Sequence, residues 1–358
     1  IDPGATLTVT GTNPIVTNTS PFAATRGTGF ELINTWYAEI NGIIDLNGES
    51  QFRQTSRSDL AITSAGYVEK DQQGTANNFT YNYWSSPVSE INTTANNQDF
   101  ALQDVFLDGT TASSPGAISW TIPANADGST SPFTISSRWI YKFVNGGDED
   151  YDAWLYTGNA GNISVGEGFT MKGVSSTSDE LEEQNYVFRG KPNNGTITVG
   201  PLGDTNLYLV GNPYLSVLDA NQFIADNLAN DATSGTLYFW EHWGGGTHTL
   251  LEYQGGYATY TTLGGTPAMS HPTVNQTDSG TKTPGRFIPV GQGFFVQGDS
   301  NAGNGVTTTV EFNNGQRGNS AGLIREYGSS PTSVFVRDGV DETLDPGMFE
   351  NPENTTNT

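Results

Sequence analysis

The sequence predicts an all-β protein in which two homologous β-sandwich units, jelly-roll-like in character, follow a short strand ladder, with one short helix in the second unit. Three observations support this fold class. One order of apolar strand segments occurs twice, short apolar segments recur at a regular spacing near the N-terminus, and turn-forming residues are abundant, with 44 Gly and 17 Pro.

The ladder is expected over residues 1–78. Apolar residues at Ile44, Phe52, Leu60 and Val68 follow one another at steps of eight residues. Alternation within each segment is typical of half-buried strands. Strands at this short, regular spacing fit either the rungs of a β-solenoid or a tight meander, so we expect a small solenoid-like or sandwich cap.

The repeat defines the two units, residues 79–200 and residues 201–318. A Gly-x-Gly step between apolar residues occurs in NISVGEGFTMK, with Gly166, and again 125 residues later in RFIPVGQGFFVQ, with Gly291. Phe188 and Phe312, which follow the two copies, are 124 residues apart. Because no helix follows these glycines, a dinucleotide site is excluded, and a bulge or a close backbone approach is expected instead.

The second unit contains the predicted helix, Val217–Leu228, which Ser216 and Asp219 would cap as a capping box. A polar segment with three prolines, residues 264–285, is expected as a long surface loop. Residues 319–358 are predicted to form a terminal strand, SVFVR at 333–337, and an acidic linker.

The charge balance excludes some classes of partner. The chain has 38 Asp and Glu against 14 Lys and Arg, a net charge of −24. Such a surface disfavours nucleic acid and anionic membranes, which bind through Lys and Arg. There is no Cys, which excludes disulfides, and no apolar run approaches the ~20 residues of a membrane helix, so no membrane insertion is expected.

Several stretches resemble a module of large surface proteins that gliding marine Bacteroidetes (Flavobacteriia) export by the type IX system. They are YNYWSSPVS, ISVGEGFTMKG, NYVFRGKPNNG, YLVGNPY, LDANQFI, LYFWEHWGGG, YQGGYATY and FIPVGQGFFVQ, and they cover roughly residues 71–317. The resemblance implies an extracellular or outer cell-surface location. It brings no catalytic residue with it.

Two candidate sites for small ligands follow from residue type. Asp148, Asp150 and Asp152 cluster in one turn and offer oxygen ligands to Ca²⁺, although they lack the EF-hand spacing. Trp240, Trp243 and Tyr257 would suit stacking on the apolar faces of sugars. The alternative is that these aromatic residues belong to the core, because their neighbours alternate as strand residues do. His242, His248 and His271 lack the spacing of a metal site and are interpreted as surface or strand-end residues.

We find no catalytic constellation and predict that the protein is not an enzyme. There is no GxSxG motif, and Glu167 has Gln292 as its counterpart in the other copy, which disfavours a paired acid–base role.

The predicted function is that of a secreted structural or adhesive surface protein, for example a fibre subunit; the alternative is a carbohydrate-binding module of a polysaccharide-degrading protein. The partners would be other copies of the chain, other surface proteins or glycans. Copies would join by strand addition, through Leu7 and Val9 or through Val334 and Val336, unless these strands pair within their own chain.

Overall fold

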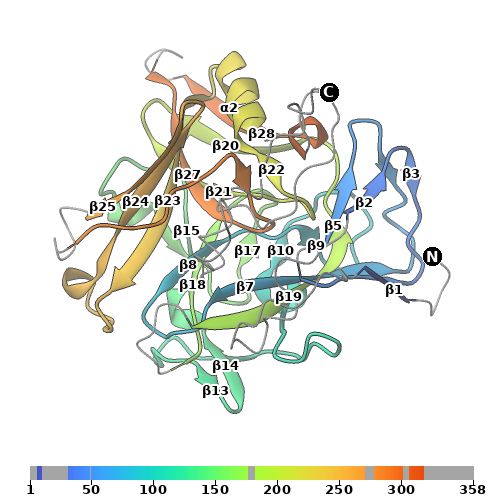
Figure 1. The fold of residues 1–358 in the computed structure, drawn as a ribbon, viewed down its shortest axis with the longest axis horizontal. Helices are drawn as coiled ribbons and strands as arrows, with labels where there is room; N and C mark the ends of the chain where they lie inside the picture. The colour runs from blue at the N-terminus through green and yellow to red at the C-terminus, as the bar shows by residue number, and fades with distance from the viewer. Residues whose placement is uncertain are drawn as a thin grey trace, which may run out of the picture.

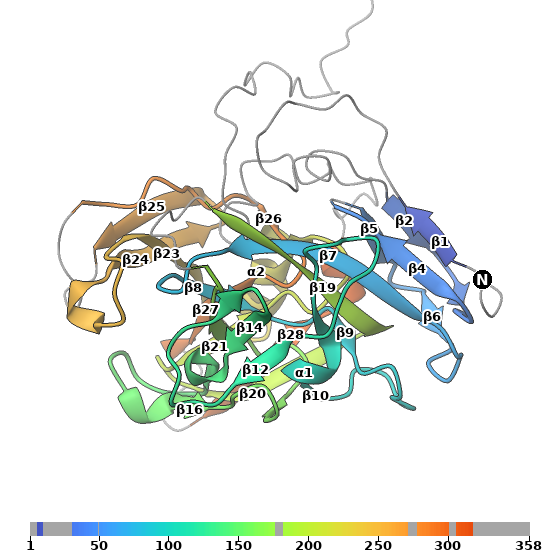
Figure 2. The same cartoon turned by 90° about the horizontal axis from the view of Figure 1, so that it is seen from below.

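The computed structural model describes residues 6–9, 31–48, 50–175, 182–270, 278–300 and 306–317. Strands dominate these residues, and their one helix of more than four residues is α2 (Ala220–Ala229), so the predicted all-β class with a short helix is confirmed. Figure 2 shows the ladder at one end of the molecule and the sheet with strands β23–β25 at the other. None of the described helices is long and apolar enough to cross a membrane.

The N-terminal ladder is a parallel β-solenoid. Its strands are β1 (Thr6–Val9), β2 (Glu31–Asn34), β3 (Tyr37–Ala38), β4 (Ile43–Leu46), β5 (Gln51–Gln54), β6 (Asp59–Leu60) and β7 (Tyr67–Thr75). Strands β1, β4 and β7 stack in parallel, as do β2 on β5 and β3 on β6. Ile44 lies opposite Val68, 24 residues later. The spacing of eight residues therefore reflects three faces per turn, and each step moves the chain to the next face.

The first unit contains β8 (Tyr81–Trp84), β9 (Val88–Ser89), β10 (Phe100–Ala101), α1 (Leu102–Val105), β11 (Phe106–Asp108), β12 (Ser119–Thr121), β13 (Ser129–Thr130), β14 (Phe133–Ser136), η2 (Ser137–Trp139), β15 (Tyr141–Phe143), η3 (Tyr151–Ala153), β16 (Trp154–Tyr156), β17 (Asn162–Ile163), β18 (Phe169–Lys172) and β19 (Glu183–Pro192). The ladder and this unit share a sheet of order β1-β4-β7-β19-β11. Figure 1 shows two of its strands, β7 and β19, side by side. This sheet crosses the boundary expected at residue 78, because β7 pairs with β4 on one side and with β19 on the other.

The second unit contains β20 (Ile197–Gly203), β21 (Leu207–Gly211), β22 (Leu218–Asp219), α2, β23 (Thr233–Gly244), η4 (Leu250–Glu252), β24 (Gln254–Thr261), β25 (Gly264–Ser270), β26 (Phe287–Ile288), β27 (Gly293–Gly298), β28 (Thr307–Phe312) and η6 (Asn314–Arg317). Its main sheet has the order β21-β27-β23-β24-β25. Strand β25 corrects the sequence-based expectation of a surface loop at this point, since it adds to the sheet beside β24.

The strand pairs of the two units have the same register. In the first unit Trp84 of β8 lies opposite Phe169 of β18, and in the second Val210 of β21 lies opposite Phe294 of β27. Pairs β10–β17 and β22–β26 correspond in the same way, and each is joined directly to a helix, α1 or α2. The repeated sequence thus produces repeated strand pairing.

The units contact each other reciprocally at the two Gly-x-Gly steps. Ser85 N donates to Gly291 O at 2.8 Å, and the equivalent Gly211 N donates to Gly166 O at 3.1 Å. Both step glycines have positive φ, 88° at Gly166 and 69° at Gly291. A Cβ at Gly166 would lie 2.7 Å from the side chain of Val199, and one at Gly291 would lie 3.0 Å from Ser85 O. The glycines are therefore points of close approach at equivalent positions of the two units.

The helix begins three residues later than predicted. Val217 lies just before β22, and Leu218 is the first residue of that strand. Because β22 pairs with β26, the backbone is extended where the capping box was expected. Asp219 is the N-cap: its carboxylate accepts from Asn221 N at 3.1 Å and binds Arg286 with two bonds of 2.9 Å. Strand pairing overrides the local capping signal here.

Buried cations attach the ladder to both units. Arg317, fully buried, donates from Nη2 to Phe52 O at 2.6 Å, from Nη1 to Gln54 Oε1 at 3.1 Å and from Nε to Ser216 Oγ at 2.9 Å. Lys191 of β19 donates to the carbonyls of Ser64 and Gly66. The ladder is thus held by charge-assisted bonds to backbone oxygens.

Candidate functional site

The least expected side chain in the structure is Lys172, at the end of β18. It is only 2% exposed, and its Nζ lies 4.1 Å from the ring centre of Trp139, 4.6 Å from that of Tyr81 and 4.8 Å from that of Tyr253. Nζ also contacts Tyr253 Oη and His248 Nδ1. We call Lys172 and these three rings the lysine cage.

The lysine and the Tyr81 ring of the cage have no counterparts in the second unit. Lys172 pairs with Tyr81 in the β8–β18 register, and the equivalent pair in the second unit is Gln297 with Leu207. The Gln297 amide is near the surface, where it donates to Thr205 O at 3.1 Å. Lys172 is buried because two segments cover it: the β12–β14 insert with η2, which has no counterpart between α2 and β23, and the loop between β23 and β24.

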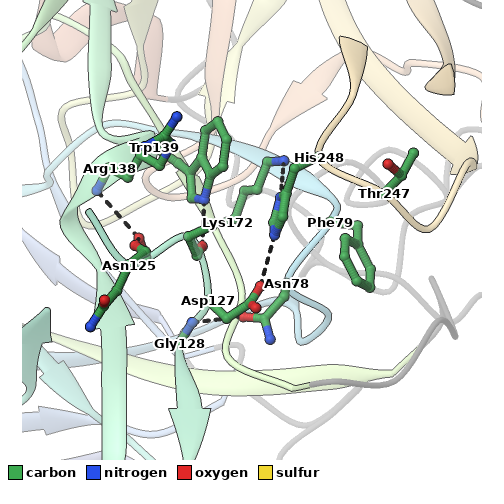
Figure 3. Close-up of polar contacts among 12 residues, drawn as sticks. Asn78, Phe79, Asn125, Asp127, Gly128, Arg138, Trp139, Lys172, Thr247 and His248 are labelled. Carbon is green, nitrogen blue, oxygen red and sulfur yellow. Dashed lines mark hydrogen bonds and ion pairs between the residues drawn. The ribbon is translucent and has the colours of Figure 1, made fainter. Parts of the chain in front are cut away.

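His248, on the β23–β24 loop, closes the cage (Figure 3). Its ring stacks on Trp139 at a centroid distance of 4.9 Å and a tilt of 20°, and Phe79 lies on it at 5.0 Å. Its Nε2 is 2.7 Å from Asp127 Oδ1, and its Nδ1 is 3.1 Å from Lys172 Nζ. Asp127, His248 and Lys172 therefore form a continuous polar chain from the surface to the cage.

The insert holds Asp127 in place through its backbone. Gly128 N donates to Asn78 Oδ1 at 2.9 Å, and Trp139 Nε1 donates to Ala126 O at 2.6 Å. The same Trp139 indole therefore positions the Asp127 loop with its N–H and the lysine with its ring face. Arg138 lies over the Trp139 ring at 5.1 Å.

Burial shifts the protonation equilibria in the cage. Desolvation lowers the pKa of Lys172 to about 7, with Asp127 opposing this shift and Arg138 adding to it. Burial likewise raises the pKa of Tyr253 to about 12 and raises that of Tyr81 well above its usual value. A nearby buried ring, His242, has its pKa lowered to about 4 by burial. The cage therefore holds one amine that titrates near neutrality between two phenols that stay protonated.

Shifted amines of this kind occur in catalytic sites. Here the amine faces three rings and an imidazole rather than solvent, so a proton can pass between Lys172 and His248. Among the described residues, no group of three His, Asp or Glu side chains is placed to hold a metal ion.

The proposed calcium ligands do not converge on one point. Asp150 caps the short helix η3 by accepting from Asp152 N at 3.1 Å, and Asp148 accepts from Glu149 N at 3.1 Å. All three carboxylates are on exposed residues. In this structure they organise a turn through backbone bonds, and calcium binding stays a prediction.

Two of the three proposed sugar-stacking residues lie in an aromatic cluster between the units. The ring of Trp240 stacks on Tyr83 with a tilt of 12°, and Tyr257 Oη is 3.1 Å from Tyr83 Oη. Phe295 packs against Tyr83 and Tyr257. Trp243 is also half-buried and packs against the core of the second unit. These placements correspond to the alternative that the residues serve as core.

The proposed assembly strands are only partly described. Strand β1, which carries Leu7 and Val9, pairs in parallel with β4 of its own chain, Leu7 opposite Ile44 and Val9 opposite Leu46. Val334 and Val336 lie outside the described residues.

Sequence reasoning missed the lysine cage. It identified His248 but interpreted it as a surface or strand-end residue, it considered Asp127 only as one of several loop aspartates that could bind Ca²⁺, and it did not single out Lys172. The available signal was a difference between the copies, because a lysine replaces Gln297 at an otherwise equivalent strand position.

A family model described as a domain of unknown function, DUF8693, matches residues 107–330, which is more than half of the chain. The chain belongs to this family. The DUF8693 match includes Asp127, Trp139, Lys172, His248 and Tyr253, and thus most of the cage, but it begins after β8, which provides Tyr81. No curated protein and no solved structure matches the chain significantly.

Proposed function

We propose that the protein is a structural or adhesive component of the outer cell surface that assembles through β1, the terminal strand of its solenoid among the described residues. The observation that carries this proposal is the position of β1. It is the terminal strand of the order β1-β4-β7-β19-β11, and in the described part of the chain it has one strand neighbour. An edge strand presents backbone N–H and C=O groups that recruit another strand.

The solenoid connects this edge strand to both units. Its strand β7 continues into the first unit as a partner of β19, and Arg317 attaches β5 to the second unit. A strand added at β1 would therefore extend a sheet that runs through the ladder into the first unit. The resemblance to surface proteins exported by the type IX system supports a location outside the cell.

The test is the size of the purified protein by light scattering, with negative-stain microscopy to detect fibres. Two matched double variants, Thr6→Pro with Thr8→Pro and Leu7→Pro with Val9→Pro, each remove alternate N–H groups from β1. The N–H groups removed by one double variant point toward β4, and those removed by the other point outward, away from it. We expect the outward pair to reduce assembly without lowering the melting temperature. A wild-type protein that stays monomeric at high concentration, or assembly unchanged in both variants, contradicts the proposal.

Deletion of residues 329–358 tests the other candidate strand, which contains Val334 and Val336. An unchanged oligomer size after this deletion excludes a C-terminal donor strand. Loss of assembly on this deletion, with the β1 variants unaffected, would move the contact to that segment.

A carbohydrate-binding function is the second candidate, favoured by exposed aromatic residues elsewhere on the first unit. Tyr151 is 65% exposed and Tyr156 is 49% exposed, beside the acidic turn at residues 148–152. Glycan-array binding that Tyr156→Ala abolishes would support this function at the first unit, whereas loss on Trp243→Ala would place it at the second.

A further inference from the structure

Two side chains of the β23–β24 loop, Tyr253 and His248, hold this loop of the second unit on the first unit. His248 inserts between Trp139 and Phe79, both residues of the first unit, and bonds to two more, Asp127 and Lys172. The neighbouring loop residues Leu250 and Leu251 are exposed, at 40% and 74%. The outer part of this contact, beyond Tyr253, therefore depends on whether His248 fits its surroundings.

The hydrogen bonds define the protonation state that fits. An ammonium has donors and no acceptor, so Nδ1 of His248 must accept from Lys172 Nζ. Nε2 then carries the proton and donates it to the carboxylate of Asp127. A neutral imidazole satisfies both neighbours. One proton thus lies between Lys172 Nζ and His248 Nδ1. It is bonded either to the amine or to the imidazole.

A second proton on this pair is not accommodated. It would place an N–H of an imidazolium against an ammonium at 3.1 Å, which brings together two donors and two like charges where Lys172 is buried and His248 is half-buried. The other groups facing the site do little to relieve this. Arg138 adds a third positive charge, Tyr81 and Tyr253 are neutral phenols, His242 is neutral, and Asp127 is the one acidic contact of His248 among the described residues.

We propose that His248 is a proton-controlled latch between the two units: with one proton on the Lys172–His248 pair the β23–β24 loop is seated, and with two it is released. Release would uncover the faces of Trp139 and Phe79 that His248 covers. The device goes beyond the proposed surface function and does not depend on it.

The experiment is hydrogen–deuterium exchange of the full chain from about pH 8 to about pH 5, a range in which imidazoles take up a proton. Rates are corrected for intrinsic exchange, and the reporter is the segment 245–253. In the wild type we expect this segment to exchange at least about tenfold faster at the acidic end, equivalent to about 1.4 kcal/mol. Amides of β21 and β27, in the core of the same unit, serve as the internal control for global unfolding.

Three variants separate the latch from ordinary loop fraying. His248→Phe keeps an aromatic ring against Trp139 but cannot be protonated, so exchange of the segment should lose its pH dependence. Lys172→Met removes the opposing charge, so the loop should stay protected in acid. His242→Gln is the matched control, a second histidine of the same hairpin, and should keep the wild-type pH profile.

The proposal is overturned by either of two results. One is a wild-type profile in which residues 245–253 gain no exchange before β21 and β27 do. The other is a pH dependence that persists in His248→Phe. If His248→Phe does not fold, the comparison of Lys172→Met with the wild type decides the question, because a latch driven by charge repulsion cannot open in acid without Lys172.

Discussion

Replacing Lys172 by Met should remove a pH-dependent cost of folding. Burial lowers the pKa of Lys172 from 10.5 to about 7. Between these values the unfolded chain carries the proton and the folded chain does not, so the stability of the wild type rises with pH across this window. The full cost is present below about pH 7 and is gone above about pH 10.5, and at about 1.4 kcal/mol per pKa unit it reaches roughly 5 kcal/mol.

Methionine has a similar length and no charge to desolvate, but it leaves Tyr253 Oη and His248 Nδ1 without their donor, which costs about 1–3 kcal/mol. It also forfeits the cation–π contacts, worth about 1–2 kcal/mol. Near pH 7 the substitution should therefore raise the free energy of unfolding by a small amount. The sharper expectation is that the difference in unfolding free energy between Lys172→Met and wild type falls by about 4 kcal/mol as the pH rises from about 7 to about 10.

The assay is urea denaturation at several pH values, taking the difference between variant and wild type so that other titrating groups cancel. Gln297→Met is the matched control, because it changes the equivalent strand position of the second unit, where there is no ionisable group. Parallel stability curves for Lys172→Met and wild type would refute the reasoning, since they would mean that Lys172 binds its proton equally well in the folded and unfolded chains.

Two further predictions concern the attachment of the ladder and the contact between units. Arg317→Met should destabilise the protein by about 3 kcal/mol, because Phe52 O and the other buried acceptors of Arg317 lose a charged donor. Arg317→Lys should restore only part of this stability. A melting temperature unchanged by Arg317→Met would contradict the role assigned to Arg317. Gly166→Ala and Gly291→Ala should each cost about 1–3 kcal/mol from positive φ together with the clash of the new Cβ. Gly195→Ala is the control, because it has φ of 77° but open space around the Cβ position, and equal losses at all three glycines would show that close approach adds nothing.

Patterns that repeat along the chain were sufficient to predict the architecture. The steps of eight residues from Ile44 to Val68 arise from the three-faced solenoid, although the sequence left a meander open, because both arrangements bury one apolar residue per strand. The duplicated glycine steps predicted two related units because strand register depends on the order of apolar and turn residues. Local rules failed where a distant strand competed with them, as at Leu218 and Asp219, whose pairing with β26 delays the helix.

The candidate site depended on tertiary structure. From the sequence alone, Lys172 would be interpreted as an ordinary polar residue at a strand end. Its equivalent in the second unit, Gln297, is such a residue in the structure. It became a caged amine because Asp127, Trp139 and His248 are brought to it by an insert and by a loop of the other unit, 45, 33 and 76 residues away along the chain. The sequence by itself determined the strands, their repetition and the acidic charge, since these follow from composition and local periodicity. Burial of the amine, the proton it shares with His248 and the contact between the units were decided only by packing, because desolvation depends on neighbours that no local pattern encodes.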